Sequence, residues 1–186
     1  MPTYKNTSNG ANPEKRAKPR VNVLRGYPGN ETTALTRSLP PKAGELIKSG
    51  MAIAVGTGPD AGLFVKADGT EAANMVFIAY HDQSDTDVMS SGKLLGFSAL
   101  GGFELETGYW GQAAGADPAD GDAICVDPGT AGQFAPVTGA EPVIGYATSD
   151  IIDWSNGQYS NTVANMAQNT EAGAAGSKVL RFVTGA

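Results

Sequence analysis

Gly50-Met-Ala-Ile-Ala-Val55 is repeated, with changes, as Gly121-Asp-Ala-Ile-Cys-Val126. Two further correspondences follow in the same order: Gly62-Leu-Phe-Val65 with Gly132-Gln-Phe-Ala135, and Phe77-Ile-Ala-Tyr80 with Val143-Ile-Gly-Tyr146. Each of these stretches is a short apolar run bounded by turn residues, which is the pattern of a β-strand. The repeat predicts two copies of a β-hairpin unit, at about residues 42–80 and 120–150.

The rest of the chain continues this pattern of short strands and turns. Lys178-Val-Leu-Arg-Phe-Val183 predicts a final C-terminal strand, and a short helix is expected only near Thr162–Gln168. No long segment has helical periodicity, and the 186 residues include 25 glycines. The sequence therefore predicts an all-β fold, a small glycine-rich β-sandwich or barrel over residues 31–186. The choice between sandwich and barrel stays open.

Residues 1–30 are predicted to form an extended N-terminal arm. Residues 1–20 hold five basic residues against one acidic residue, a charge of +4, so the remainder of a chain of net charge −6 carries −10. A basic arm on an acidic body is typical of an interaction tail, although a solvated terminus has the same composition. Tyr4 is the one aromatic residue among the first twenty, so base stacking along nucleic acid is not expected. The predicted contact residues are Lys15, Arg16, Lys18, Arg20, Val21, Val23, Leu24 and Tyr27.

The sequence offers little for catalysis. It has one histidine, His81, and one cysteine, Cys125, so a zinc site of the usual composition is not expected. Asp82 follows His81 in a polar loop, but no Gly-x-Ser-x-Gly motif accompanies it, and a Ser-His-Asp triad is not predicted. Cys125 lies in an apolar run, which predicts a buried and inert thiol. We expect no enzyme activity and no cofactor.

Three other motifs have a structural and a functional interpretation. Glu104 and Glu106 lie on one face of a predicted strand, where paired carboxylates serve glycosidases but more often only solubilise a wet face. The glycine-rich segment Gly56–Gly62 lacks the Gly-Lys-Ser/Thr of a phosphate-binding loop, and the hairpin interpretation is favoured. Two acidic loops offer carboxylates for Ca²⁺ without matching the EF-hand pattern. Their residues are Asp82, Asp85 and Asp87, and Asp117, Asp120 and Asp122.

Aromatic residues in the second half of the chain are candidates for an interface or a sugar-binding platform. They are Tyr109, Trp110, Tyr146, Trp154 and Tyr159. A core or subunit contact is the favoured interpretation. Met1–Lys5 lacks the apolar stretch of a secretory signal, and no run of residues is long and apolar enough for a membrane span. The sequence predicts synthesis in a cytoplasm and no membrane partner.

The assembled pattern resembles the decoration proteins of tailed bacteriophages, also called cement or head-stabilising proteins. The resemblance covers roughly residues 20–150 and is one of strand and turn motifs after an extended arm. The stretches that carry it are Lys42–Val55, Phe103-Glu-Leu-Glu-Thr107, Asp120-Gly-Asp-Ala-Ile-Cys-Val126 and Pro142-Val-Ile-Gly-Tyr-Ala-Thr148.

The resemblance implies a structural virion protein without catalytic residues. Such a protein is made in the host cytoplasm, binds the outer surface of the mature capsid, and stabilises the junctions between subunits. It implies the major capsid protein and further copies of the chain, as a homotrimer, as partners, with no direct contact to nucleic acid. A carbohydrate- or receptor-binding β module of a virion tail or cell surface is the alternative hypothesis.

Overall fold

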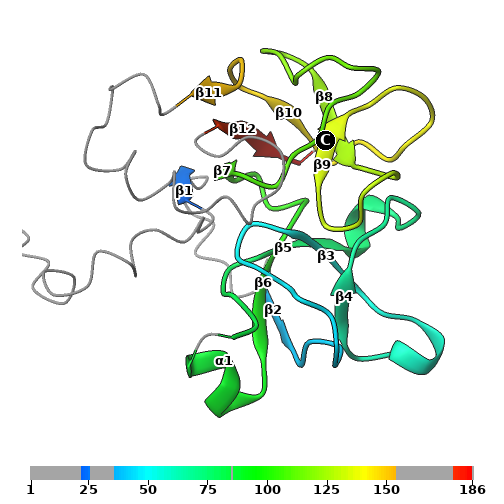
Figure 1. Cartoon of the computed structure of the whole chain (residues 1–186), viewed down its shortest axis with the longest axis vertical. Coiled ribbons are helices and arrows are strands. Elements are labelled where there is room, and N and C mark those ends of the chain that lie inside the picture. Colours follow the sequence, from blue (N-terminus) through cyan, green and yellow to red (C-terminus); the bar gives the residue numbers. More distant parts are fainter. Residues whose placement is uncertain (1–21, 26–35, 85, 154–177, 186) are drawn as a thin grey trace, which may run out of the picture.

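The computed structural model describes residues 22–25, 36–84, 86–153 and 178–185. Over these residues the chain is built from strands, with the 3₁₀ turns η4 (Gly58–Asp60) and η5 (Ala73–Met75) and one short helix, α1 (Thr86–Ser91), as Figure 1 shows. The predicted all-β fold is confirmed. The sequence analysis did not predict α1, which begins within the acidic loop that follows His81. The predicted helix near Thr162–Gln168 lies outside the described residues.

The first five-stranded sheet has the order β2-β6-β5-β3-β4, and all of its pairs are antiparallel. Its strands are β2 (Thr36–Leu39), β3 (Ala52–Val55), β4 (Phe64–Lys66), β5 (Val76–Ala79) and β6 (Leu94–Ser98). The chain after β2 returns to β4. Phe64 N donates to Pro40 O at 2.8 Å, and Lys42 N donates to Phe64 O at 2.8 Å. These bonds join the first strand to the last, and we call the closed set barrel 1.

The second sheet contains a path of the same kind, β7-β12-β10-β8-β9. Its strands are β7 (Glu104–Thr107), β8 (Ala123–Val126), β9 (Phe134–Pro136), β10 (Gly145–Ala147) and β12 (Lys178–Thr184). Phe134 N donates to Tyr109 O at 3.0 Å and Gly111 N donates to Phe134 O at 2.8 Å, so this set, barrel 2, is also closed. Two more strands are added to it: β1 (Asn22–Arg25) on β7 and β11 (Ile152–Asp153) on β12.

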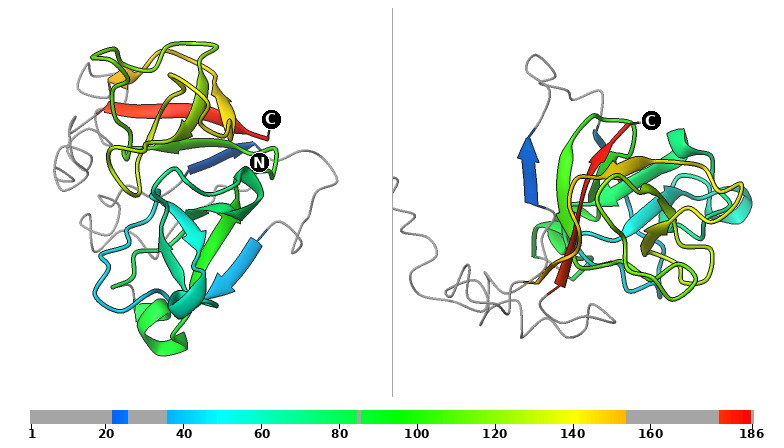
Figure 2. Two further views of the ribbon diagram at one scale, coloured as in Figure 1. Left: turned by 90° about the vertical axis from the view of Figure 1, so that its right-hand side faces the viewer. Right: turned by 90° about the horizontal axis from the view of Figure 1, so that it is seen from above.

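The two barrels agree in register as well as in strand order. Val55 pairs with Phe64 in barrel 1. Val126 pairs with Phe134 in barrel 2. The pairing of β6 with β2 likewise has its counterpart in the pairing of β12 with β7. The expected C-terminal strand at 178–183 is therefore a member of the second set and completes it. Figure 2 shows the barrels as two neighbouring lobes.

One correspondence inferred from the sequence is out of step with the registers. The sequence comparison aligned Tyr80 with Tyr146. In the structure, Ala52 faces Ile78 in barrel 1, and Ala123 faces Tyr146 in barrel 2. Tyr146 thus takes the place of Ile78. The segment from Phe134 to Tyr146 is two residues shorter than the equivalent segment from Phe64 to Ile78, whereas the alignment of Tyr80 with Tyr146 requires a difference of four.

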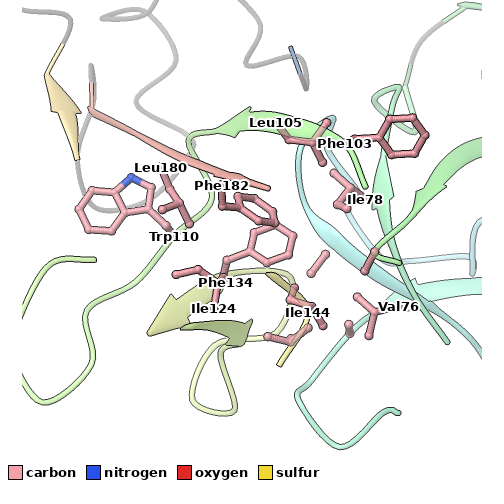
Figure 3. Close-up of a cluster of buried hydrophobic side chains, with 14 of the residues drawn as sticks. Val76, Ile78, Phe103, Leu105, Trp110, Ile124, Phe134, Ile144, Leu180 and Phe182 are labelled. Atoms are coloured by element: carbon pink, nitrogen blue, oxygen red, sulfur yellow. The ribbon is translucent and has the colours of Figure 1, made fainter. Parts of the chain in front are cut away.

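The main hydrophobic core draws side chains from both barrels (Figure 3). Phe134 and Phe182 lie with their ring centroids 5.1 Å apart inside barrel 2. Val76 and Ile78 come from the outer face of barrel 1, where buried alanines such as Ala52 let the two backbones approach closely. A smaller cluster around Phe64 fills barrel 1 itself. The shared core makes the two barrels one packed unit, although the chain has few large apolar residues.

A glutamate caps the turn that follows the second strand of each hairpin. Glu71 accepts hydrogen bonds from Asp68 N at 3.2 Å and Gly69 N at 3.1 Å. Glu141 accepts one from Gly139 N at 2.7 Å. Hydrogen bonds from its own backbone N–H and that of Gly139 lower the pKa of Glu141. A lowered pKa in the folded state means that the stabilisation is present at neutral pH and is lost as the pH falls through that lowered pKa.

Candidate functional site

The predicted contact residues fall into two groups. Val23 and Leu24 belong to β1. The other six lie outside the described residues: Lys15, Arg16, Lys18, Arg20, Val21 and Tyr27.

Strand β1 lies within the range predicted as an arm, yet it is part of the second sheet. It pairs antiparallel with the outer edge of β7, with Asn22 opposite Glu106 and Val23 opposite Leu105, and the register shifts before Arg25. In Figure 1 it lies beside β7 at the margin of barrel 2. An open strand edge accepts any segment that offers a matching backbone, and here the N-terminal segment of the same chain occupies it.

The paired carboxylates of β7 are engaged in structural contacts. Arg181, opposite Glu106 on β12, donates through Nε to Glu106 Oε1 at 3.0 Å, and the Glu106 side chain is only 4% exposed. Glu104 accepts a hydrogen bond from Thr148 Oγ1 at 3.2 Å. A buried carboxylate needs such a partner, because an unpaired charge away from water is costly. These contacts tie β7 to β12 and to the end of β10, and they support the structural interpretation of this pair.

A polar cavity of about 510 Å³ opens beside the β3–β4 hairpin. One of its lysines, Lys42, pairs with two of its carboxylates. Lys42 Nζ lies 2.8 Å from Asp60 Oδ2 and 3.7 Å from Glu45 Oε1, and Glu45 Oε2 accepts from Lys66 N at 2.6 Å. The hydrogen bond that Lys42 donates to Asp60 is the largest cause of the raised pKa of Lys42. This network attaches the segment after β2 to the hairpin, a structural role that accounts for its charges.

The acidic loops do not assemble a cation site within the described ranges, where no group of three or more His, Cys, Asp or Glu side chains has the spacing of a metal site. Asp82 is buried and accepts a hydrogen bond from Ser49 N at 2.7 Å, which holds the chain before β3. His81 contacts the ring of Tyr80 edge-on, with centroids 4.6 Å apart. Asp117 accepts from Gln112 Nε2 at 2.7 Å. The side chains of Asp85 and Asp87 lie outside the described set.

The aromatic candidates separate clearly by exposure. Tyr109 and Trp110 are 2% and 3% exposed, and Trp110 Nε1 donates to Lys178 O at 3.3 Å, so both belong to the core. Tyr146 is 44% exposed on the outer face of β10. Trp154 and Tyr159 lie outside the described residues. A sugar platform needs exposed rings, and the core position of Tyr109 and Trp110 removes them from one.

Cys125 is buried, as the sequence predicted, and its Sγ lies 3.4 Å from Ala135 O. Burial raises the pKa of Cys125 to about 11, with smaller contributions from the negative charges of Glu141 and Asp127. Thiolate is the reactive form, so we expect the native protein to resist alkylation by iodoacetamide at pH 8 and to react within minutes in denaturant. Mass spectrometry of the labelled chain measures this. Fast labelling of the native protein would contradict the burial of Cys125.

The sequence analysis did not identify the exposed apolar side chains near α1. Met89 is 74% exposed on the helix, and Leu46 is 73% exposed in the segment before β3. Their neighbours Val88 and Ile47 are buried in the barrel 1 cluster. The signals in the sequence are the apolar pairs Val88-Met89 and Leu46-Ile47, and neither pair indicates which of its two residues faces water.

No protein-family model matches the sequence, and no curated protein matches it significantly. Among the residues that the structure describes, no helix is long and apolar enough to cross a membrane.

Proposed function

We propose that this chain is a structural virion protein of a tailed bacteriophage, which binds the outer surface of the mature capsid and stabilises the junctions between its subunits. The partners in this proposal are the major capsid protein and further copies of the chain, assembled as a homotrimer. The proposal rests on the strand and turn motifs quoted above and on the position of β1.

The position of β1 is the observation that carries the proposal furthest. A four-residue segment, preceded in the sequence by the basic residues between 15 and 20, adds a strand to a sheet edge. Strand addition relies on main-chain hydrogen bonds and thus tolerates many partner sequences. A chain that docks in this way, and continues into a basic tail, is suited to join a folded body to acidic surfaces beside it. Many weak contacts of this kind on one particle add up through avidity.

The folded body suits a protein that holds neighbouring capsid subunits together. Its two barrels share one core, and its buried charged side chains, such as Glu106, are paired within the fold. Glu104 and Glu106 also contribute contacts within the fold, to Thr148 and Arg181. A rigid two-lobed body is suited to span a boundary between subunits and to resist their separation.

Removal of residues 1–24 is expected to lower the apparent affinity for capsids about tenfold or more, because the arm's contribution to avidity is lost. The particles are undecorated, expanded heads assembled from the major capsid protein encoded in the same genome. Bound protein is measured by co-sedimentation and gel densitometry. The β body is expected to stay folded, which circular dichroism checks. Unchanged occupancy after the truncation would remove the arm from the account.

A charge-neutral variant separates the two contributions of the arm. Replacing Lys15, Arg16, Lys18 and Arg20 by glutamine leaves β1 intact and removes the basic charge. If the arm contacts are mainly ionic, this variant and a rise in salt concentration reduce binding of the full chain to a similar extent. If the full chain stays on the heads at high salt while the truncated chain dissociates, the binding is due to β1 and its apolar neighbours. Failure of the full chain to bind any such head would overturn the proposed function.

A further inference from the structure

Besides the shared core and the hydrogen bond from Thr107 Oγ1 to Gly50 O, one hairpin of barrel 2 contacts barrel 1 through its backbone. The β8–β9 hairpin of barrel 2 reaches barrel 1, where Ala52 N donates to Gly132 O at 3.0 Å and Gly132 N donates to Ala67 O at 2.8 Å. A Cβ atom built on Gly132 would lie 3.5 Å from Met51 Sδ, so this glycine is packed directly on barrel 1. Gly132 therefore anchors the hairpin through both of its backbone polar groups.

Among the described residues, the equivalent hairpin of barrel 1 makes no such contact with another part of the chain. Gly62 occupies the place of Gly132, since both follow an alanine and precede the paired second strand of a hairpin. Their φ angles are +85° and +86°, a backbone conformation suited to glycine. Yet a Cβ atom on Gly62 would meet no atom of the described residues within 4 Å. Most residues from Thr57 to Gly62 are exposed. We call residues 57–63 the exposed hairpin.

The surface that receives the hairpin also has a counterpart on barrel 2. In barrel 1, Gly50 lies against barrel 2, with a built Cβ atom 2.9 Å from Thr107 Oγ1 and 3.5 Å from a ring carbon of Tyr109. Gly121 is the equivalent residue of barrel 2, because Gly50 N bonds to Ala79 O as Gly121 N bonds to Ala147 O. A Cβ atom on Gly121 meets nothing within 4 Å in the described part of the chain.

The apolar character of the receiving face is kept in barrel 2. Ala123 and Tyr146 stand where barrel 1 has Ala52 and Ile78. Ile78 is fully buried against barrel 2, whereas Tyr146 is 44% exposed. Val137 matches Ala67, because each donates its N–H to the first residue of the central strand. We call the surface formed by Ala123, Val137, Tyr146 and Val183 the exposed face, in which Tyr146 is exposed and the other three residues are half-buried.

We propose that a second copy of this chain docks its exposed hairpin on the exposed face. By equivalence with the internal contact, Gly62 N of one copy donates to Val137 O of the other, and Ala123 N donates to Gly62 O. If a two-fold axis related the two barrels, Gly62 would contact barrel 2 of the same chain, as Gly132 contacts barrel 1. Gly62 does not make this contact. The contact is therefore head-to-tail, and repetition of such a contact closes into a ring when the rotation permits.

This interface supplies the self-association that the proposed function includes, but it follows from the repeated barrels without reference to a capsid. Two variants disrupt its two sides. Tyr146→Arg places a charge on the exposed face, and Ala61→Arg places one beside Gly62 in the exposed hairpin. Met89→Arg, on α1, is the matched control, since it adds the same charge at an exposed apolar position outside both surfaces.

Native mass is measured by size exclusion with light scattering over a range of micromolar concentrations. The wild type and Met89→Arg are expected to be oligomers, and Tyr146→Arg and Ala61→Arg monomers that melt like the wild type. A mixture of the two monomeric variants is expected to form a 1:1 dimer and nothing larger. The reason is that Tyr146→Arg keeps an intact hairpin, Ala61→Arg keeps an intact face, and only one productive contact exists between them.

Three results would each overturn this interface. They are a wild type that is monomeric at every concentration, an oligomer that survives both arginine substitutions, and a mixture of the variants that stays monomeric. The first would assign the exposed face to something other than a second copy, such as residues 154–177. Capsid binding is scored separately by co-sedimentation. A monomer that decorates heads would refute the interface while leaving the proposed function standing.

Discussion

Phe134→Ala is expected to lower the free energy of unfolding by about 3–5 kcal/mol, the usual cost of removing a buried phenylalanine side chain. Phe134 is fully buried and packs against Phe182 in the core that both barrels share. Its backbone also bonds to Tyr109 and Gly111, which closes barrel 2. The cavity left by this substitution lies among strands that are hydrogen-bonded on both sides, so the surrounding side chains have little freedom to fill it.

Urea unfolding followed by circular dichroism measures this loss. Phe64→Ala removes the equivalent ring of barrel 1 and is expected to cost a similar amount, because Phe64 is also fully buried. Met89→Ala is the control and is expected to change stability by less than about 1 kcal/mol, as for most exposed positions. A loss below about 1 kcal/mol for Phe134→Ala would show that this ring is not in the core.

Gly145→Ala is expected to be destabilising by about 3 kcal/mol, the upper end of the usual range for overpacking. A Cβ atom at Gly145 would lie 2.1 Å from Val183 O and 3.2 Å from a ring carbon of Phe182. Because β10 lies between β8 and β12, it has no open side toward which it can move. Either β10 separates from β12 or the Val183 peptide turns away, and both break the ladder of barrel 2.

Gly139→Ala serves as the control for this substitution. Its nearest contact, at 3.4 Å, is with the flexible carboxylate of Glu141, which has room to adjust. We expect its effect on the unfolding free energy to stay within about 1 kcal/mol. Thermal melts of the two alanine variants at equal concentration compare them directly. Equal melting temperatures would contradict the close approach of β10 and β12.

Several strands could be predicted because their signal is local. Ala52–Val55 and Ala123–Val126 are short apolar runs between turn glycines, and Lys178–Thr184 is a longer run rich in apolar residues. Burial on one or both faces of a strand leaves this mark directly in the order of residues. The buried thiol of Cys125 followed from the same kind of pattern.

Other features depend on contacts between distant residues, which a local pattern does not encode. The closure of barrel 1 needs Phe64 to meet Pro40, and the true partner of Ala123 is Tyr146 in a register that the repeat missed by two residues. The pairing of β1 with β7 joins segments some eighty positions apart. At the candidate site, the composition of the sequence indicated a basic arm. That Tyr146 is exposed where barrel 1 has the buried Ile78 became clear only from the comparison of the two barrels.

The proposal of a capsid-binding protein is tested most directly by the number of copies bound to expanded heads at saturation. Purified full-length chain is titrated onto undecorated heads, and bound copies per head are counted by quantitative mass spectrometry after sedimentation. The account predicts saturable binding at a fixed number of copies per capsid subunit, together with heads that withstand higher temperature. No binding above the level of an unrelated acidic protein would contradict it.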